Sequence, residues 1–143
     1  MSGLSKHLAL ALFNNSLNPV RTAYEPPVGL WLALHTAAPS DATYGNEASF
    51  ASYARQALNS LTATPQTETA GGDLDILASN GSAVIFPAST GAVGQTITHW
   101  AIWDSQAAGT GNVLYSGSLG AARTVNSGDS VVVGQGQLTL TIK

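Results

Sequence analysis

Residues 96–119 read TITHWAIWDSQAAGTGNVLYSGSL, and this stretch decides the fold class. Its first nine residues alternate in polarity, which is the pattern of a β-strand with one buried face. A glycine-rich turn over 106–111 follows, and residues 113–119 then return as the antiparallel partner strand. The side chains expected on one face of the first strand are Ile97, His99, Ala101 and Trp103.

The earlier stretch VGLWLALHT, residues 28–36, is apolar on both faces. Leu32 and Leu34 point one way. Trp31 and His35 point the other way. A strand of this kind is typical of the centre of a sheet and needs cover on both sides. We therefore expect a second sheet over one face and a helix or a partner protein over the other, which makes Trp31 a candidate partner-contact residue.

Further short strands are predicted between residues that favour turns. With the three strands above they make about seven, separated by Gly, Pro, Asn and Asp, and this spacing predicts an all-β fold, an antiparallel β-sandwich. Residues 37–48 are expected to form a loop, and residues 62–75 a long loop or an extended arm. The other strand segments are residues 50–61, 82–86, 131–133 and 138–142.

The N-terminus predicts one short helix followed by an extended connector. Leu4, Leu8 and Leu12 recur at intervals of four and would share one helix face. Ser2 is the expected N-cap, and Pro19 follows the end of the helix. The predicted parts of the chain are residues 1–27, the helix and connector, and residues 28–143, the β-sandwich domain.

A helix of this length is marginal in water on its own, so its apolar face must bury against something. The sequence leaves open whether that is the sandwich of the same chain or a neighbouring protein. The candidate partner contacts are Leu4, Leu8, Leu12 and Phe13, together with Trp31.

The chain is unusually poor in charge. Five Lys and Arg and eight Asp and Glu make up 9% of its 143 residues, against about 25% in an average soluble domain. The surface must therefore consist largely of small uncharged polar groups, which lose little when they are desolvated. Such a surface is suited to lying against other protein.

The same composition argues against several classes of protein. The basic residues are scattered, whereas nucleic-acid binding needs a basic stripe. No apolar run approaches the length of a membrane span, and no convincing signal peptide is present, so we expect synthesis in a cytoplasm. With no cysteine, there is no disulfide framework and no thiolate metal site.

Residues for catalysis are also scarce. His99 and Asp104 are five apart on one predicted strand and point to opposite faces, and no strained serine elbow is present. The three histidines lack the spacing of metal ligands. We expect no enzyme activity and no cofactor. A glycan site on exposed tryptophans is the more serious alternative, although Trp31, Trp100 and Trp103 all lie in apolar strand patterns, where burial is the usual outcome.

Arg55 is the exceptional basic residue, because it lies between apolar segments. We expect it to form a structural ion pair that fixes the 37–48 loop against the sheet. Its candidate partners are Asp41, Glu47 and Asp104.

These loops and strands also carry a family resemblance. Through a series of motifs, the chain resembles a family of small tailed-bacteriophage virion proteins that are commonly labelled tail fibre protein. Some similar small β-proteins are capsid decoration, or cement, proteins. The resemblance runs from about Val28 to Ile142 and leaves out the N-terminus and the 62–75 segment. The motifs are LALHTAAPSD at 32–41, GNE at 45–47, YARQ at 53–56, VIFPAS at 84–89, ITHWAIWD at 97–104, GNVLYSG at 111–117 and TVNSGD at 124–129.

This resemblance implies a structural role in the virion and supplies no catalytic residues. The favoured hypothesis is a capsid decoration protein, a homodimer or homotrimer made in the host cytoplasm that binds the major capsid protein. A compact single domain without shaft repeats fits that role. The alternative is a tail fibre or tail-tip component that contacts the host surface.

Overall fold

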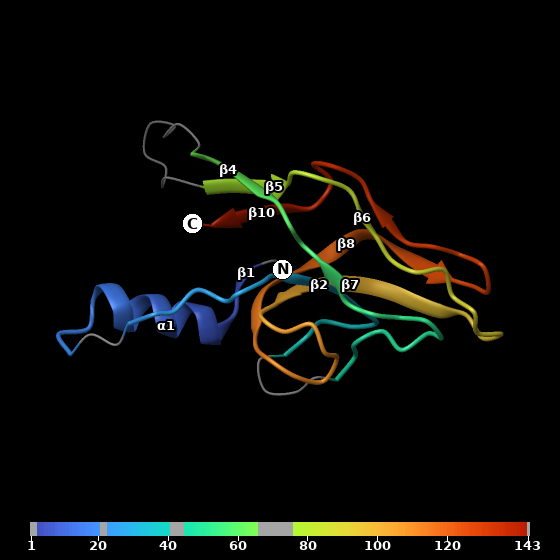
Figure 1. Cartoon of the computed structure of the whole chain (residues 1–143), viewed down its shortest axis with the longest axis horizontal. Coiled ribbons are helices and arrows are strands. Elements are labelled where there is room, and N and C mark those ends of the chain that lie inside the picture. The colour runs from blue at the N-terminus through green and yellow to red at the C-terminus, as the bar shows by residue number, and fades with distance from the viewer. Residues whose placement is uncertain (1–2, 21–22, 41–44, 66–75, 143) are drawn as a thin grey trace.

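The computed structural model describes residues 3–20, 23–40, 45–65 and 76–142. Within these ranges the chain forms ten β-strands and one α-helix, and every strand pair is antiparallel (Figure 1). The predicted all-β sandwich is confirmed. More strands are present than the seven expected, because four of the ten are only two residues long.

The larger sheet has five strands in the order β1-β8-β7-β2-β3. Strand β2 lies between β7 and β3, so it is an inner strand of the sheet, as its two apolar faces predicted, although β7 holds the central position. The N-terminal segment contributes β1 to the edge of this sheet. The bounds are β1 (Gly3–Leu4), β2 (Trp31–His35), β3 (Gln56–Ala57), β7 (Gln95–Trp103) and β8 (Val113–Val125).

The second layer consists of a three-stranded sheet, β10-β5-β4, and a two-stranded sheet, β6-β9. Figure 1 shows the three-stranded sheet above the larger sheet, with β6 and β9 continuing the layer toward the right. The bounds are β4 (Leu61–Pro65), β5 (Ile76–Asn80), β6 (Val84–Ile85), β9 (Val132–Val133) and β10 (Thr139–Ile142).

Two segment predictions were wrong around β3 and β4. Residues 50–61 are not one strand, because a turn at 51–52 interrupts them and only Gln56–Ala57 pair with β2. The expected 62–75 loop begins as regular strand, because Leu61–Pro65 pair with β5. Residues 66–75 lie outside the described part of the chain.

The main hydrophobic core fills the space between the two layers. It draws on all three sheets and on the loops that join them, so the two layers are held together by apolar burial. Its largest fully buried members are Leu32, Leu34, Phe86, Ile97 and Val125.

Strand β7 does not alternate throughout. Its register with β8 shifts between Ile97 and His99, which marks a β-bulge. Because of this irregularity Ile97 packs in the main core, whereas Ala101 and Trp103 lie on the opposite face. The prediction that Ile97 shares their face was wrong, since counting with a period of two assumes an unbroken pleat.

The opposite face of the larger sheet carries a smaller apolar cluster, and loops of the same chain cover it. The Arg55 guanidinium carbon lies 4.0 Å from the ring centre of Trp103. Trp31 packs half-buried against this cluster, so the chain itself supplies much of the cover that was expected from a partner. The fully buried members are Ala33, Ala101, Trp103 and Val113.

The helix α1 (Lys6–Ser16) begins later than predicted. Ser5 is its N-cap, since the Ser5 Oγ accepts a hydrogen bond from the Leu8 N–H at 3.1 Å. Leu4 is therefore not on the helix but in β1, opposite Tyr115. The expected cap, Ser2, lies outside the described residues. Strand pairing decides this boundary, because the Ser5 N–H donates to the Leu114 carbonyl at 2.9 Å.

Tyr115 joins the two layers at the edge of β10. Its hydroxyl donates to the Thr141 carbonyl at 2.8 Å and accepts from the Thr141 N–H at 3.2 Å. Its ring stacks on Trp100 with centres 5.9 Å apart. Trp100 in turn lies over Gly117, where an added Cβ would approach the indole to 2.6 Å.

We expect Gly117→Ala to lower the free energy of unfolding by about 1–3 kcal/mol, because the new methyl group displaces a packed indole ring. Gly120→Ala on the same strand is the control, since a Cβ there meets nothing within 4 Å. Urea denaturation of both variants measures the difference. Equal stabilities would show that Trp100 adjusts without cost.

Candidate partner-binding surface

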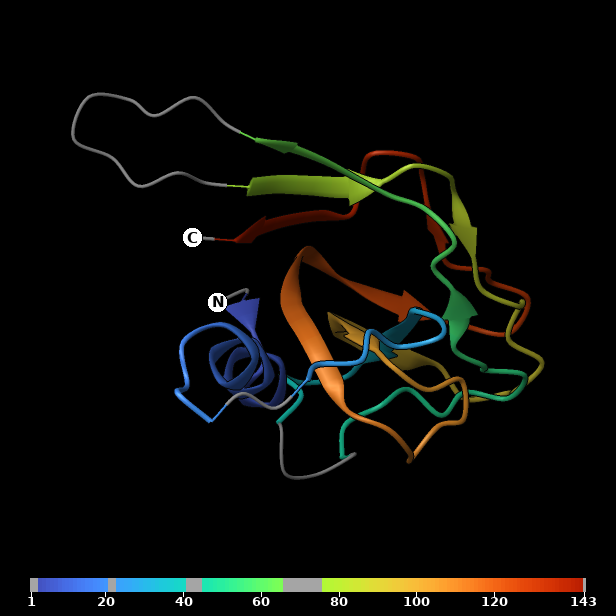
Figure 2. The same ribbon diagram turned by 60° about the vertical axis from the view of Figure 1, so that its left-hand side comes forward.

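The N-terminal arm, residues 3–20, carries much of the exposed apolar surface. Five of the twelve large apolar side chains that are exposed in the described residues belong to it. No residue of α1 is fully buried. Figures 1 and 2 show the helix projecting from one side of the sandwich. The five side chains are Leu10, Leu12, Phe13, Leu17 and Val20.

The base of the arm is attached to the sandwich. Leu4 and Leu8 pack, partly buried, against the main core of their own chain. Leu12 and Phe13 do not, and are 41% and 51% exposed. The four predicted contact residues therefore divide into two that anchor the arm and two that remain available to another protein.

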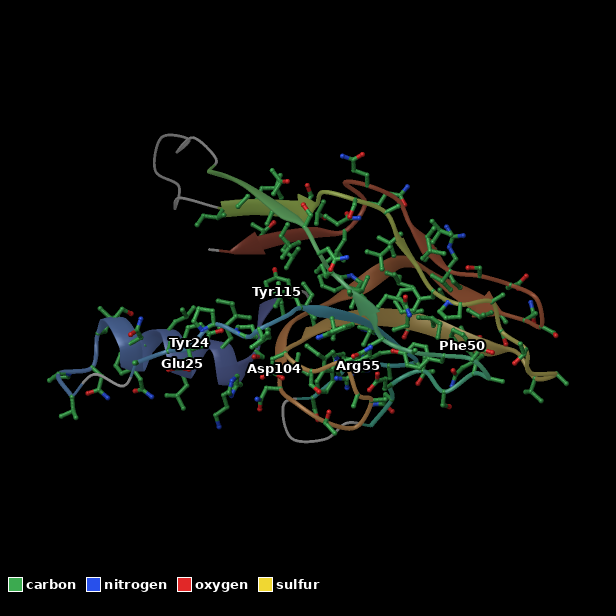
Figure 3. All side chains as sticks on the ribbon, in the orientation of Figure 1. Tyr24, Glu25, Phe50, Arg55, Asp104 and Tyr115 are labelled. Atoms are coloured by element: carbon green, nitrogen blue, oxygen red, sulfur yellow. The ribbon has the colours of Figure 1, made fainter. Side chains whose placement is uncertain are left out.

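A groove of about 390 Å³ separates α1 from the connector that returns beside it. Figure 3 shows Tyr24 and Glu25 of this connector alongside the helix. The lining residues are His7, Leu10, Ala11, Asn14, Ala23, Tyr24 and Glu25.

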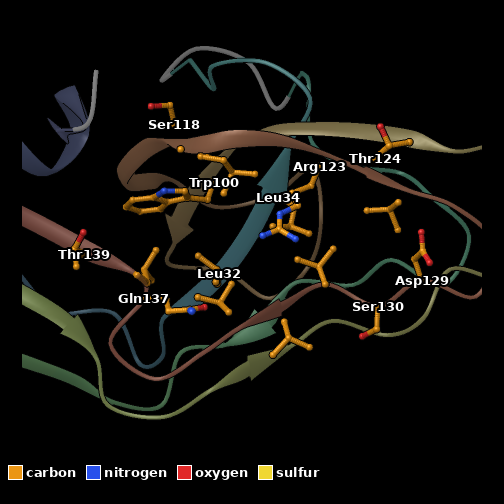
Figure 4. Close-up of a pocket in the computed structure, with 17 residues that line it drawn as sticks. Leu32, Leu34, Trp100, Ser118, Arg123, Thr124, Asp129, Ser130, Gln137 and Thr139 are labelled. Carbon is orange, nitrogen blue, oxygen red and sulfur yellow. The ribbon is translucent and has the colours of Figure 1, made fainter.

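A larger cavity of about 560 Å³ opens between the two layers (Figure 4). Leu32, Leu34 and Trp100 from the larger sheet form one wall, and residues 130–133 and 137–139 form the other. Arg123 and Asp129 bring one positive and one negative charge to its lining. Leu32 and Leu34 are themselves buried, so the space presents a lining of mixed polarity with one charge of each sign.

A buried polar cluster fixes the loops on the outer face of the larger sheet. Arg55 is 2% exposed. Its Nε donates to Glu47 Oε1 at 2.7 Å and its Nη2 to Glu47 Oε2 at 2.8 Å, a bidentate ion pair. Its Nη1 donates to the carbonyls of Ser105 and Thr110 at 2.8 and 3.0 Å. One side chain therefore ties the loop before β3 to the loop between β7 and β8.

Glu47 is held as a carboxylate. Burial alone would raise its pKa, but the hydrogen bonds and charge of Arg55 and the hydrogen bond from Tyr53 outweigh burial, so the pKa lies below its ordinary value. The Tyr53 hydroxyl donates to Glu47 Oε1 at 3.0 Å and accepts from the Leu34 N–H at 3.1 Å. Burial, followed by the charge of Glu47, raises the pKa of Tyr53 well above its ordinary value.

His35 lies beside this cluster and is fully buried. Its ring stacks on Trp103, with centres 6.0 Å apart and planes 11° apart, and its Nε2 accepts from Trp103 Nε1 at 3.4 Å. Burial lowers the pKa of His35 to about 4, and the charge of Glu47 only partly opposes this. The ring is therefore neutral at neutral pH.

Of the candidate partners of Arg55, the structure brings only Glu47 to it among the described residues. Asp41 lies outside the described part of the chain. Asp104 instead accepts from the backbone N–H and the side-chain amide of Asn112, at 2.6 and 2.8 Å. It thereby closes the turn between β7 and β8.

The tryptophans do not form an exposed platform for a sugar. Trp100 and Trp103 are buried, and Trp31 is half-buried. His99 Nδ1 lies 2.8 Å from the hydroxyl of Thr98. Among the residues that the structure describes, no three His, Asp or Glu side chains come together in a way that could hold a metal ion. No described helix is long and apolar enough to cross a membrane.

The sequence did not point to the cavity or to Leu17 and Val20 at the end of the arm. Leu17 and Val20 follow the last helical residue, so helical periodicity gave no reason to select them. The cavity lining comes from segments up to about a hundred residues apart, and no local pattern joins them.

Comparison with protein families now defines the class. The chain is a structural protein of a bacteriophage virion, which confirms the resemblance seen in its motifs. Residues 3–141 match the family described as Podophage GP4 fiber I protein gp80, and the chain belongs to that family. The match includes the N-terminal arm, which the motifs had left out. No curated protein sequence matches the chain.

We expect Glu47→Gln to lower the free energy of unfolding by about 3 kcal/mol, because it leaves the Arg55 guanidinium buried without a counter-charge. Glu25→Gln, at an exposed acid on the connector, should change it by less than about 0.5 kcal/mol. Urea denaturation at pH 7 compares the two variants. Equal effects would mean that the ion pair does not stabilise the fold.

We also expect stability to fall as the pH drops from about 6.5 to about 4. In the unfolded chain His35 takes up a proton near its ordinary pKa of 6.5, whereas burial delays this to about 4 in the folded protein. The unfolded state therefore binds more protons in this window, and the loss approaches roughly 3 kcal/mol at its acid end.

Thermal unfolding across this pH range measures the loss. His35→Gln keeps an acceptor for Trp103 Nε1 but cannot titrate, so its profile should be flatter than that of the wild type. His7→Gln, at an exposed histidine on α1, should leave the profile unchanged. A wild-type profile that is already flat between pH 6.5 and 4 would contradict the role of His35.

Proposed function

We propose that this chain is a non-enzymatic subunit of a fibre-type appendage of a phage particle. The observation that carries the proposal is the family match over residues 3–141, which spans the arm and the whole sandwich. The proposed partners are other virion proteins and further copies of the chain.

The character of the surface supports a structural role. Few charged groups would have to be desolvated when the protein packs into a particle. The buried ionisable groups serve packing: Arg55, Glu47 and His35 are all engaged with neighbouring groups in one cluster. The apolar arm offers surface that is suited to protein contacts.

Capsid decoration, the hypothesis favoured by the sequence, now takes second place. The scarcity of charge and the compact domain fit both roles equally, whereas the family name fits the fibre. In a decoration role the partner would be the major capsid protein, and the arm would be the element that binds it.

Electron cryomicroscopy of virions labelled with Fab fragments against this chain tests the proposal. We expect label on an appendage, in a low copy number set by the symmetry of that appendage. Quantitative mass spectrometry of purified particles, with the major capsid protein as the internal reference, gives the copy number. Label distributed over the capsid surface in proportion to the capsid lattice would overturn the fibre proposal and favour decoration.

A further inference from the structure

The cavity between the two layers has the size of a small-molecule site. Its volume of about 560 Å³ lies within the range of roughly 300–1,000 Å³ that is typical of ligand pockets. Leu119, Val131 and Val133 are only partly buried, and they supply apolar surface that remains open to the space. Trp100 in the wall is buried, so a ligand here does not need an exposed aromatic ring to stack on.

A positive charge extends into this space from the larger sheet. Arg123 on β8 lies directly opposite Ile97 on β7, and opposite residues of two antiparallel strands extend to the same face of the sheet. Ile97 belongs to the main core, so Arg123 also lies on the side that faces the second layer. Figure 4 shows its guanidinium reaching into the cavity. Inward positions of a sandwich are normally apolar, so this position is exceptional.

The guanidinium of Arg123 has no counter-ion in the described part of the chain, where it forms neither a hydrogen bond nor an ion pair. Asp129 also lines the cavity but does not pair with it. The Asp129 Oδ2 instead accepts from the backbone N–H and the side-chain amide of Asn126, at 2.9 and 3.3 Å, and closes the turn between β8 and β9. Because Arg123 is exposed, a ligand entering from solvent can reach its five N–H donors.

Three further polar side chains of the lining have donors that the described chain does not use. The Gln137 Oε1 accepts from the Gly134 N–H at 2.8 Å, which fixes this side chain and leaves its amide NH₂ for the cavity. The hydroxyls of Ser118 and Thr139 also have no hydrogen-bond partner among the described residues. The unused groups around the cavity are thus mainly donors, and they suit a ligand that is rich in acceptors and carries a negative charge.

We propose that the cavity binds an acidic sugar, with the sugar carboxylate on Arg123. A guanidinium holds a carboxylate through two parallel charge-assisted hydrogen bonds. The ring hydroxyls then bind the amide of Gln137 and the two free hydroxyls of the lining, and the C–H groups of the ring cover the three apolar side chains. A neutral sugar leaves the guanidinium unused, and an alkyl carboxylate leaves the amide and the hydroxyls facing hydrocarbon. The site goes beyond the fibre role and does not depend on it, because it needs only the folded chain.

Two-dimensional ¹⁵N–¹H NMR of the 14.6 kDa chain tests this site by titration at pH 7, where a sugar carboxylate is ionised. The probe is D-galacturonate, its neutral counterpart is D-galactose, and acetate carries the carboxylate without the ring. We expect galacturonate to shift the signals of residues 118–124 and 130–139 with a Kd in the millimolar range. Galactose and acetate should each bind at least about tenfold more weakly, because each makes only part of the contacts.

Three substitutions separate the contributions of the lining. Arg123→Gln removes the positive charge, and Gln137→Glu keeps an oxygen for its turn but replaces the free donor by an anion, so each should weaken galacturonate binding at least about tenfold. Asp129→Asn keeps an oxygen for Asn126 and removes the negative charge, so it should strengthen binding about threefold. The control is Lys6→Gln, which removes a positive charge on α1 outside the cavity and should leave binding unchanged. Circular dichroism and thermal unfolding show that each variant is folded.

Four results would contradict the proposal. Galacturonate could leave the spectrum unchanged, the folded Arg123→Gln variant could bind it as the wild type does, or galactose or acetate could bind as tightly as galacturonate. In the fourth result, N-acetyl-alanyl-alanine, a dipeptide with a free carboxylate, binds more tightly than galacturonate, which means that the cavity takes a protein C-terminus and not a sugar. Because these experiments use the purified chain, they can fail while the fibre location holds, and the location can fail while they succeed.

Discussion

The bidentate ion pair between Arg55 and Glu47 is the constraint on which the rest of the structure depends. The larger sheet has apolar residues on both faces, and a small chain has only one second layer with which to cover them. The other face is closed by two loops, and Arg55 holds both of them through Glu47 and through the carbonyls of Ser105 and Thr110. Its guanidinium also lies on the Trp103 ring, so it seals the small apolar cluster directly.

A buried ion pair is costly unless every donor and acceptor is satisfied. Here Tyr53 and two backbone carbonyls complete the hydrogen bonds around the pair, and His35 stays neutral beside it. In a chain with thirteen charged residues, two of them are committed to this one cluster. Charge is scarce in the chain as a whole, so the outer surface carries few ions and is easily covered by other protein.

Much of the fold could be predicted because its signals are local. Two apolar faces placed β2 inside a sheet and not at its edge, and a glycine-rich turn marked the hairpin of β7 and β8. The features that the sequence predicted wrongly depend on pairing between distant segments. Ile97 changes face at a bulge that only the register with β8 reveals, and Leu4 leaves the helix because β8 offers it a strand partner. For the site, Arg55 was noticeable because charge is scarce, whereas the cavity is assembled by tertiary structure alone.

The arm also combines a part that is held by contacts with distant segments and a part that has only local contacts. Its base is fixed, since β1 pairs with β8 and Leu8 reaches the core, but no residue of the helix is fully buried. A helix of eleven residues is marginal in water, so this segment is stabilised most when a second surface covers it. Where a partner covers this helix, the free energy gained depends on the local concentration of that partner. In a virion that concentration is set by the neighbouring proteins, and the outer part of the arm, which carries no charge from Leu8 to Val20, loses little when it is buried against them.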